Sequence, residues 1–368
     1  MNSSRFFVPK LQDLILSEPG ALKELIEKAA SSPVLFQAIS PLLTHHLLTL
    51  VVRGEKNAAE AMLQQASLFK DKTLLEALLS SKDTVASYSF GLDRNNPVKV
   101  KGTALQIALI ADDVDVIIDG EKVVDGIAEM ILPYFKKLTD GEELIAAQLQ
   151  VDPAEEKKEQ ERSARDLEAL EKVLKALETV TNAEAEAALA HDAKEDNPAE
   201  AALIEFRNAL EPKEVVTFGR KQFNPALLLR ALELYDEKFA AFGNTWDAPK
   251  NKLFVRKIIG YIDRFLSACT GQVFAFGGFY VIEMREKLIR NLKFRSDNAV
   301  IFPLDSDPRS RLGYDFMAGR GARYDGTARR AAGSDAVVLF KTYVEQKQRA
   351  RDIMQRPSNP TKSSCLIS

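Results

Sequence analysis

The sequence predicts an all-α fold. Ala, Leu, Glu and Lys fill most segments, and the alternation of apolar and polar residues that marks β-strands is almost absent. The chain has 368 residues, of which 46% are hydrophobic and 28% charged, and its formal net charge is −3. This length is sufficient for two or three packed domains, and so small a charge gives no argument for a nucleic-acid partner.

The two cysteines are too few for a disulfide framework, so we expect a reducing compartment. Cys269 lies in a densely apolar and aromatic stretch and is expected to be a small buried residue. No run reaches the roughly 18 apolar residues of a transmembrane helix, and the first residues lack the pattern of a secretory signal peptide. We therefore expect any membrane association to occur without a spanning segment.

The first expected unit, residues 1–40, is an N-terminal helical cap. Its short helices begin near Pro9, Pro19 and Pro33, because proline is tolerated at the start of a helix and not inside it. An apolar stretch, residues 21–26, has its leucines and isoleucine at helical spacing.

The second expected unit, residues 41–150, consists of helical hairpins. An apolar helix ends at Gly54 and a second helix begins near Asn57. A related pair begins with Thr103 as a helix cap, and residues 89–102 are predicted to be the loop between the two pairs. Each hairpin has an apolar face that a neighbour must cover.

The third expected unit, residues 151–214, is an acidic helical insert. Residues 151–200 contain no aromatic residue and many more acids than bases. One apolar helix face remains, carried by Leu167, Leu170, Val173, Leu174 and Leu177. We favour a solvated charged face over an acidic arm that binds a partner.

Residues 215–345 predict a helical C-terminal domain with an irregular segment at 300–333 that is rich in Gly, Pro, Asp and Arg. A last helix is expected from Ser334 to Met354. We assign residues 346–368 to a flexible basic tail, because residues 355–364 show no apolar periodicity.

Parts of the chain resemble the ankyrin-type units of effector proteins that Legionella and its relatives inject into host cells. The matching residues are LLTLVVRGEKNAAEAMLQQ, GTALQIALIADDVDV and GIAEMILPYFKKLTDGEELIAAQ, and NAVIFPLDSDPRSRLGYDFMAGR resembles a C-terminal signature of that group. The resemblance implies an ankyrin-like scaffold. The T-P-L-H-x-A motif of a standard repeat is present only as TALQIA, from Thr103 to Ala108.

No motif for metal, phosphate or nucleophilic catalysis is present in the sequence, and no cofactor is expected. The adjacent His45 and His46 point about 100° apart on a helix, which favours a structural role. An enzyme of unrecognised class remains an alternative, with its site in residues 304–323. The side chains that would form this site are Asp305, Asp307, Arg309 and Arg311, although we favour turn capping and local ion pairs as their explanation.

A second alternative is an F-box-like adaptor that recruits a host ubiquitin ligase. Some effectors of this group carry an F-box, and residues 8–39 show proline followed by helical leucines in a faintly similar order. The usual L-P-x-E opening is absent, so a helical cap over the first hairpin explains the same residues.

The last four residues form a C-a-a-X motif, in which a cysteine precedes two aliphatic residues. Cys365, Leu366, Ile367 and Ser368 fit this motif, and a terminal serine favours attachment of farnesyl to the cysteine. A single isoprenoid holds a membrane weakly, so a second signal is expected. Basic residues that could attract an anionic membrane surface are Lys347, Arg349, Arg351, Arg356 and Lys362.

These features predict a non-enzymatic bacterial effector-type scaffold that binds a host protein. A host prenyltransferase would modify Cys365, and the protein would be secreted by the bacterium into the host cytoplasm and held at the cytoplasmic face of a host membrane.

Overall fold

The computed structural model describes residues 32–87, 98–190, 197–211, 213–245, 248–276, 278–290 and 334–355, with three isolated positions before residue 32. These residues are predominantly helical, as predicted. Two small β-sheets are also present, so the all-α prediction was too simple. The segments 8–23 and 304–323, and the tail from Arg356 to Ser368, lie outside the described residues.

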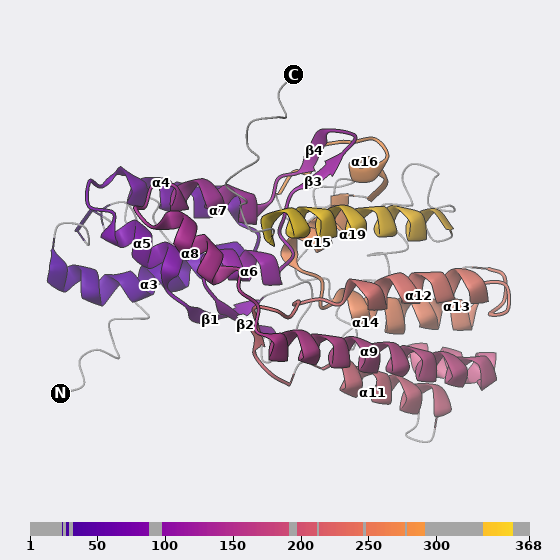
Figure 1. Cartoon of the computed structure of the whole chain (residues 1–368). Coiled ribbons are helices and arrows are strands. Elements are labelled where there is room, and N and C mark those ends of the chain that lie inside the picture. Colours follow the sequence, from indigo (N-terminus) through magenta and orange to yellow (C-terminus); the bar gives the residue numbers. More distant parts are fainter. Residues whose placement is uncertain are drawn as a thin grey trace, which may run out of the picture.

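The helices of the first half lie at one end of Figure 1. They are α3 (Pro33–Val52), α4 (Lys56–Leu68), α5 (Thr73–Ser80), α6 (Ala104–Ile110), α7 (Ile127–Phe135) and α8 (Gly141–Gln148). The predicted end of the first hairpin helix at Gly54 is confirmed, because this glycine follows α3 with φ +71°. The predicted cap Thr103 is also confirmed and forms a capping box with Gln106. Helix α4 begins one residue before Asn57, at Lys56.

The strands of the first half were not predicted. Strand β1 (Asp83–Ser87) pairs antiparallel with β2 (Val98–Gly102), and β2 pairs parallel with β5 (Val216–Thr217). Strand β2 therefore occupies part of the predicted loop 89–102, and β5 joins the two halves of the chain. A second sheet is the hairpin of β3 (Val116–Ile118) and β4 (Glu121–Val124). Asp119 and Gly120 at its turn both have positive φ, as a tight two-residue hairpin turn requires.

The second half is a set of packed helices. They are α9 (Pro153–Thr179), α10 (Asn182–Ala190), α11 (Pro198–Leu210), α12 (Pro225–Lys238), α13 (Pro249–Leu253), the π-helix η1 (Phe254–Ile259), α14 (Gly260–Asp263), α15 (Ala268–Phe276), α16 (Gly278–Ile282) and α19 (Ser334–Gln355). Three of them begin in the same way: Asp152, Asn197 and Asn224 cap the helix and a proline follows.

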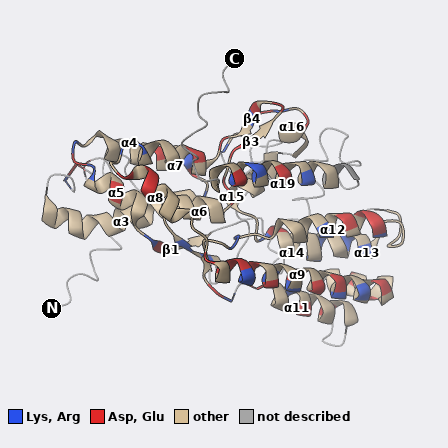
Figure 2. Ribbon diagram, viewed as in Figure 1, with Lys and Arg blue, Asp and Glu red and all other residues tan. Residues whose placement is uncertain are grey.

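The acidic insert packs against the rest of the fold along one face. Leu170, Val173, Leu174 and Leu177 are buried, and α9 contacts both α11 and α12. The predicted apolar stripe is therefore confirmed. Figure 2 shows acidic and basic residues interspersed along α9. Pairs such as Lys158 with Glu155 lie one turn apart.

Two predicted unit boundaries fall inside helices. Helix α3 runs through the boundary at residues 40 and 41, and α19 runs through the boundary at 345 and 346. The helix predicted from Ser334 to Met354 is confirmed as α19, and residues 346–355 therefore do not belong to the flexible tail that was predicted to begin at 346. In Figure 1, α19 (yellow) lies beside the β3–β4 hairpin, and it also contacts α12 and α16.

Helix α3 is long and apolar enough to cross a membrane by length and composition, which the sequence analysis did not expect. The core helix of a folded domain passes the same test. From Ile39 onward its buried side chains include Leu43, Leu47 and Val51, and the helix packs against α5, α6 and β1. In the described fold its second half is therefore a core helix, whereas Val34 near its start is exposed.

Candidate functional site

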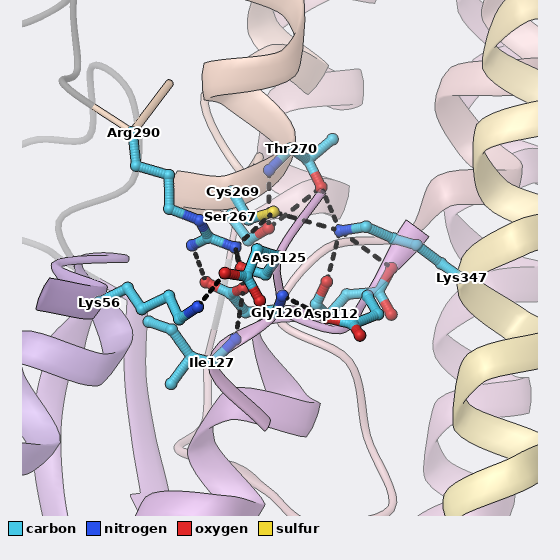
Figure 3. Close-up of polar contacts among 12 residues, drawn as sticks. Lys56, Asp112, Asp125, Gly126, Ile127, Ser267, Cys269, Thr270, Arg290 and Lys347 are labelled. Carbon is cyan, nitrogen blue, oxygen red and sulfur yellow. Dashed lines mark hydrogen bonds and ion pairs between the residues drawn. The ribbon is translucent and has the colours of Figure 1, made fainter. Parts of the chain in front are cut away.

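A buried cluster of charged side chains lies where the two halves of the chain meet (Figure 3). Its centre is the turn that follows α6, where Asp112 adopts a positive φ of 56° and Asp113 follows it. The start of α15, the segment after α16 and the middle of α19 approach this turn. We call this cluster the aspartate-turn junction.

Arg290 joins the segment after α16 to the turn. Its guanidinium donates to both carboxylate oxygens of Asp113, at 2.7 and 2.5 Å, and to the backbone oxygen of Asp125 at 2.7 Å. The Asp113 side chain is only 2% exposed. Burial alone would lower the pKa of Arg290, but the charge of Asp113 outweighs it and raises the pKa, so this arginine stays charged. The result is a buried bidentate ion pair.

Helix α19 reaches the same turn through two side chains one helical turn apart. The ammonium of Lys347 donates to the backbone oxygen of Asp112 and lies 3.4 Å from the hydroxyl of Thr270. Arg351 donates to the backbone oxygen of Leu109 and pairs with the Asp112 carboxylate at 2.5 Å. Burial would raise the pKa of Asp112, but the charges of Arg351 and Lys347 overcome it and lower the pKa.

Cys269 lies in the middle of the junction and is 2% exposed, which confirms the predicted burial. Its sulfur is 3.6 Å from Arg290 and 3.7 Å from Lys347. Burial and the charge of Asp113 nevertheless raise the pKa of the thiol. A nucleophilic cysteine needs an accessible thiolate, so this environment favours a structural thiol over a reactive one.

A second acidic group borders the junction at the start of α7. The carboxylate of Asp115 accepts from the backbone N–H of Gly126 at 2.6 Å and pairs with Lys122 at 2.6 Å. Glu129 lies beside it, and one Glu129 oxygen has no hydrogen-bond partner in the described part of the chain. Burial, together with the charges of Asp115 and Asp113, raises the pKa of Glu129 to about 7.

We expect Glu129→Gln to change how stability depends on pH. Between pH 4.5 and 7 the unfolded chain loses a proton that folded Glu129 still holds, so this residue lowers stability as pH rises through that range. The variant lacks this titration. Its free energy of unfolding, relative to the unsubstituted protein, should increase by about 3 kcal/mol between pH 4 and pH 8.

Urea denaturation at several pH values measures this difference. Glu143→Gln on the exposed face of α8 is the control and should show no such trend. A pH-independent difference for Glu129→Gln would contradict the raised pKa.

The junction is suited to holding elements together. Its charged groups bind one another, and Lys347, Cys269 and Thr270 are each at most 3% exposed in the described part of the chain. Within the described residues, no three His, Cys, Asp or Glu side chains are grouped in a way that could hold a metal ion.

The structure corrects the predicted role of two basic residues. Lys347 and Arg351 were expected to face an anionic membrane, but both point into the junction because Asp112 and two backbone oxygens bind them. Arg349 is exposed on the same helix and remains accessible to a surface. Arg356 and Lys362 lie outside the described residues, as do Cys365, Leu366, Ile367 and Ser368. The residues of the alternative enzyme site, Asp305, Asp307, Arg309 and Arg311, also lie outside them.

The role of the histidine pair was predicted from the sequence, whereas the residues of the junction were not. His45 contacts the Asp83 carboxylate at 2.7 Å, in keeping with the structural role that we favoured. No site prediction from the sequence included Asp112, Asp113 or Arg290. Two consecutive acids directly after an apolar helix were a usable signal, but nothing in the spacing indicated a basic partner 177 residues away.

Comparison of the chain with protein-family models, with curated proteins and with solved structures found no match. A functional assignment therefore depends on the residues and geometry of this chain.

Proposed function

We propose that this chain is a non-enzymatic scaffold that binds a host protein and is anchored to the cytoplasmic face of a host membrane through farnesylated Cys365. The observation that carries the proposal is the motif Cys365-Leu366-Ile367-Ser368. The motif acts only where Ser368 is the carboxyl terminus of the protein in the cell. The resemblance to injected effectors supports a host prenyltransferase as the modifying enzyme.

The position of the motif relative to the last helix is compatible with modification. Helix α19 ends at Gln355, and residues 356–364 separate it from Cys365. Fully extended, these residues span at most about 30 Å. That length is enough for the motif to enter a transferase while the helix stays docked on the junction.

The electrostatic part of the anchor is smaller than the sequence indicated, because Lys347 and Arg351 are engaged in the junction. Arg349, Arg356 and Lys362 remain as candidates for attraction to anionic lipid. Each contributes about 1 kcal/mol when it lies near the surface. We therefore propose that the isoprenoid supplies most of the membrane affinity and the basic residues add to it.

The scaffold part of the proposal rests on the helical pairs of the first half. The turn at Gly54 joins α3 to α4, and Thr103 caps α6. We propose that these pairs are ankyrin-like units, whose stacked faces commonly bind other proteins. The buried environment of Cys269 supports a structural role for the junction. We therefore propose that the partner binds on the surface of the helical pairs.

Intact mass and membrane fractionation after expression in a eukaryotic cell test the anchor. We expect the full chain, with nothing appended after Ser368, to gain the mass of a farnesyl group and to sediment with membranes. Cys365→Ser should remove both the added mass and the membrane recovery. Ser368→Leu should exchange farnesyl for geranylgeranyl and retain membrane recovery.

A chain with one extra alanine after Ser368 is the matched control, because it keeps every native residue and displaces the motif. An unmodified, soluble full chain would refute the anchor. Membrane recovery that survives in Cys365→Ser would show that another feature binds the membrane.

A further inference from the structure

A cavity of about 270 Å³ lies among the helices of the second half, with no lining residue in common with the aspartate-turn junction. It is formed by α9, the segment between α11 and α12, the start of α12, and α14. Helices α9, α11 and α12 lie side by side in Figure 1. One wall is apolar and includes Phe223, Leu227, Ile262 and Phe265.

The lining also carries basic side chains. Arg162 binds Glu159 at 2.7 Å, and Arg220 binds Glu155 at 2.9 Å. Arg165 and Lys213 also line the cavity, and neither has an ion-pair partner in the described part of the chain. Basic side chains outnumber acidic ones in the lining. The cavity therefore favours an anion over a cation.

Gln222 is a further lining residue and is only 2% exposed. Its backbone N–H donates to the oxygen of Ile110 at 2.9 Å, which fixes its position. Neither the oxygen nor the nitrogen of its side-chain amide has a hydrogen-bond partner among the described residues. Buried amides are almost always paired, because an unpaired one has lost its hydrogen bonds to water.

Neighbouring Asn224 has all the partners that Gln222 lacks. Its side-chain oxygen accepts from the N–H of Leu227, and its nitrogen donates to Asp166 at 3.2 Å. Asn224 is thus explained as a helix cap, whereas the Gln222 amide forms no hydrogen bond within the described fold. A ligand in the cavity would provide the missing partner.

We propose that this cavity binds a small organic anion, in which a carboxylate or phosphate group is joined to an apolar ring. The anionic group lies against Arg162 and Arg165, because a guanidinium matches either oxyanion. The ring packs on Phe223 and Phe265, and a polar group beside it pairs with Gln222. This combination of an apolar wall with few polar groups is typical of small-molecule sites. The proposal is independent of the membrane anchor.

Fluorine NMR of the full chain tests the site with para-fluorobenzoate and para-fluorophenyl phosphate. We expect at least one of these probes to show saturable broadening, and neutral para-fluorobenzyl alcohol to show none. Arg165→Ala should weaken binding by about tenfold, because it removes a charged partner of the anion. Gln222→Leu should also weaken binding, while the loss of an unpaired buried amide raises the melting temperature.

Lys172→Ala is the matched control, because Lys172 is an exposed basic residue of the same helix, paired with Glu168 outside the cavity. It should bind the probes like the unsubstituted chain. The proposal is overturned if neither anionic probe broadens, if the neutral probe binds equally well, or if binding is unchanged in Arg165→Ala. Arg165 is exposed, so a failure to fold does not confuse this result.

Discussion

Arg290→Met is expected to lower the free energy of unfolding by about 3–5 kcal/mol. The substitution keeps an unbranched side chain of similar length and removes the only guanidinium that binds both Asp113 oxygens among the described residues. Asp113 would then be a buried carboxylate without a cation, and the backbone oxygen of Asp125 would lose a donor. Urea denaturation followed by circular dichroism measures the loss.

Arg285→Met is a matched control for this prediction. Arg285 lies five residues earlier in the same segment and also binds an aspartate, Asp119, but both side chains are largely exposed. Exposed ion pairs contribute little, so we expect a change below about 1 kcal/mol. Asp113→Asn combined with Arg290→Met should recover part of the loss, because it removes the stranded charge. If both arginine substitutions lowered the free energy of unfolding equally, the junction would contribute no more to stability than an exposed ion pair.

Lys347→Met is the second large effect, with an expected loss of about 2–3 kcal/mol. The ammonium of Lys347 is the donor to the Asp112 backbone oxygen, and it also lies over the ring of Tyr343, 4.7 Å from the ring centre. Methionine fills a similar volume but leaves that oxygen unpaired in a buried place. Because Arg351 still holds Asp112, the loss should be smaller than for Arg290→Met. Hydrogen exchange should show α19 opening before the rest of the fold.

Arg349→Met separates the structural role of α19 from its surface role. Arg349 lies two residues from Lys347 and is exposed, so its substitution should leave stability within about 0.5 kcal/mol. Binding of the folded, unmodified chain to vesicles containing anionic lipid should fall for Arg349→Met and stay unchanged for Lys347→Met. The reverse pattern would restore Lys347 to the membrane role and contradict its buried position.

The helices of this protein were largely predictable because their signals are local. Thr103 with Gln106, Gly54 after α3, and the leucine stripe of α9 each specify structure through residues only a few positions apart. The strands were not predictable in the same way. The sequence VKVKG alternates as a strand should, but it is only five residues long and follows a proline, so a loop explained it as well. Its pairing with β5 also depends on residues more than a hundred positions away.

The candidate sites also differ in whether their residues are close together or far apart in the sequence. The motif at Cys365 is contiguous in sequence and needs no fold to be recognised. The basic residues of α19 were assigned to a membrane from charge alone, and charge alone cannot distinguish an exposed lysine from one that is 1% exposed. The cavity beside α9 is lined by residues between positions 98 and 265, and no sequence motif relates these positions to one another.

By itself, the sequence determined the helical character of this protein, the caps and ends of several helices, the burial of Cys269 and the presence of a prenylation motif. These properties follow from backbone propensity, apolar periodicity and contiguous residues. Only the tertiary structure decided that Arg290 and Lys347 face the aspartate turn, that β5 completes the first sheet, and that Gln222 lacks a partner beside a cavity. Such properties depend on which distant segments exclude water from one another, and burial of this kind sets the energy of a charge or an amide.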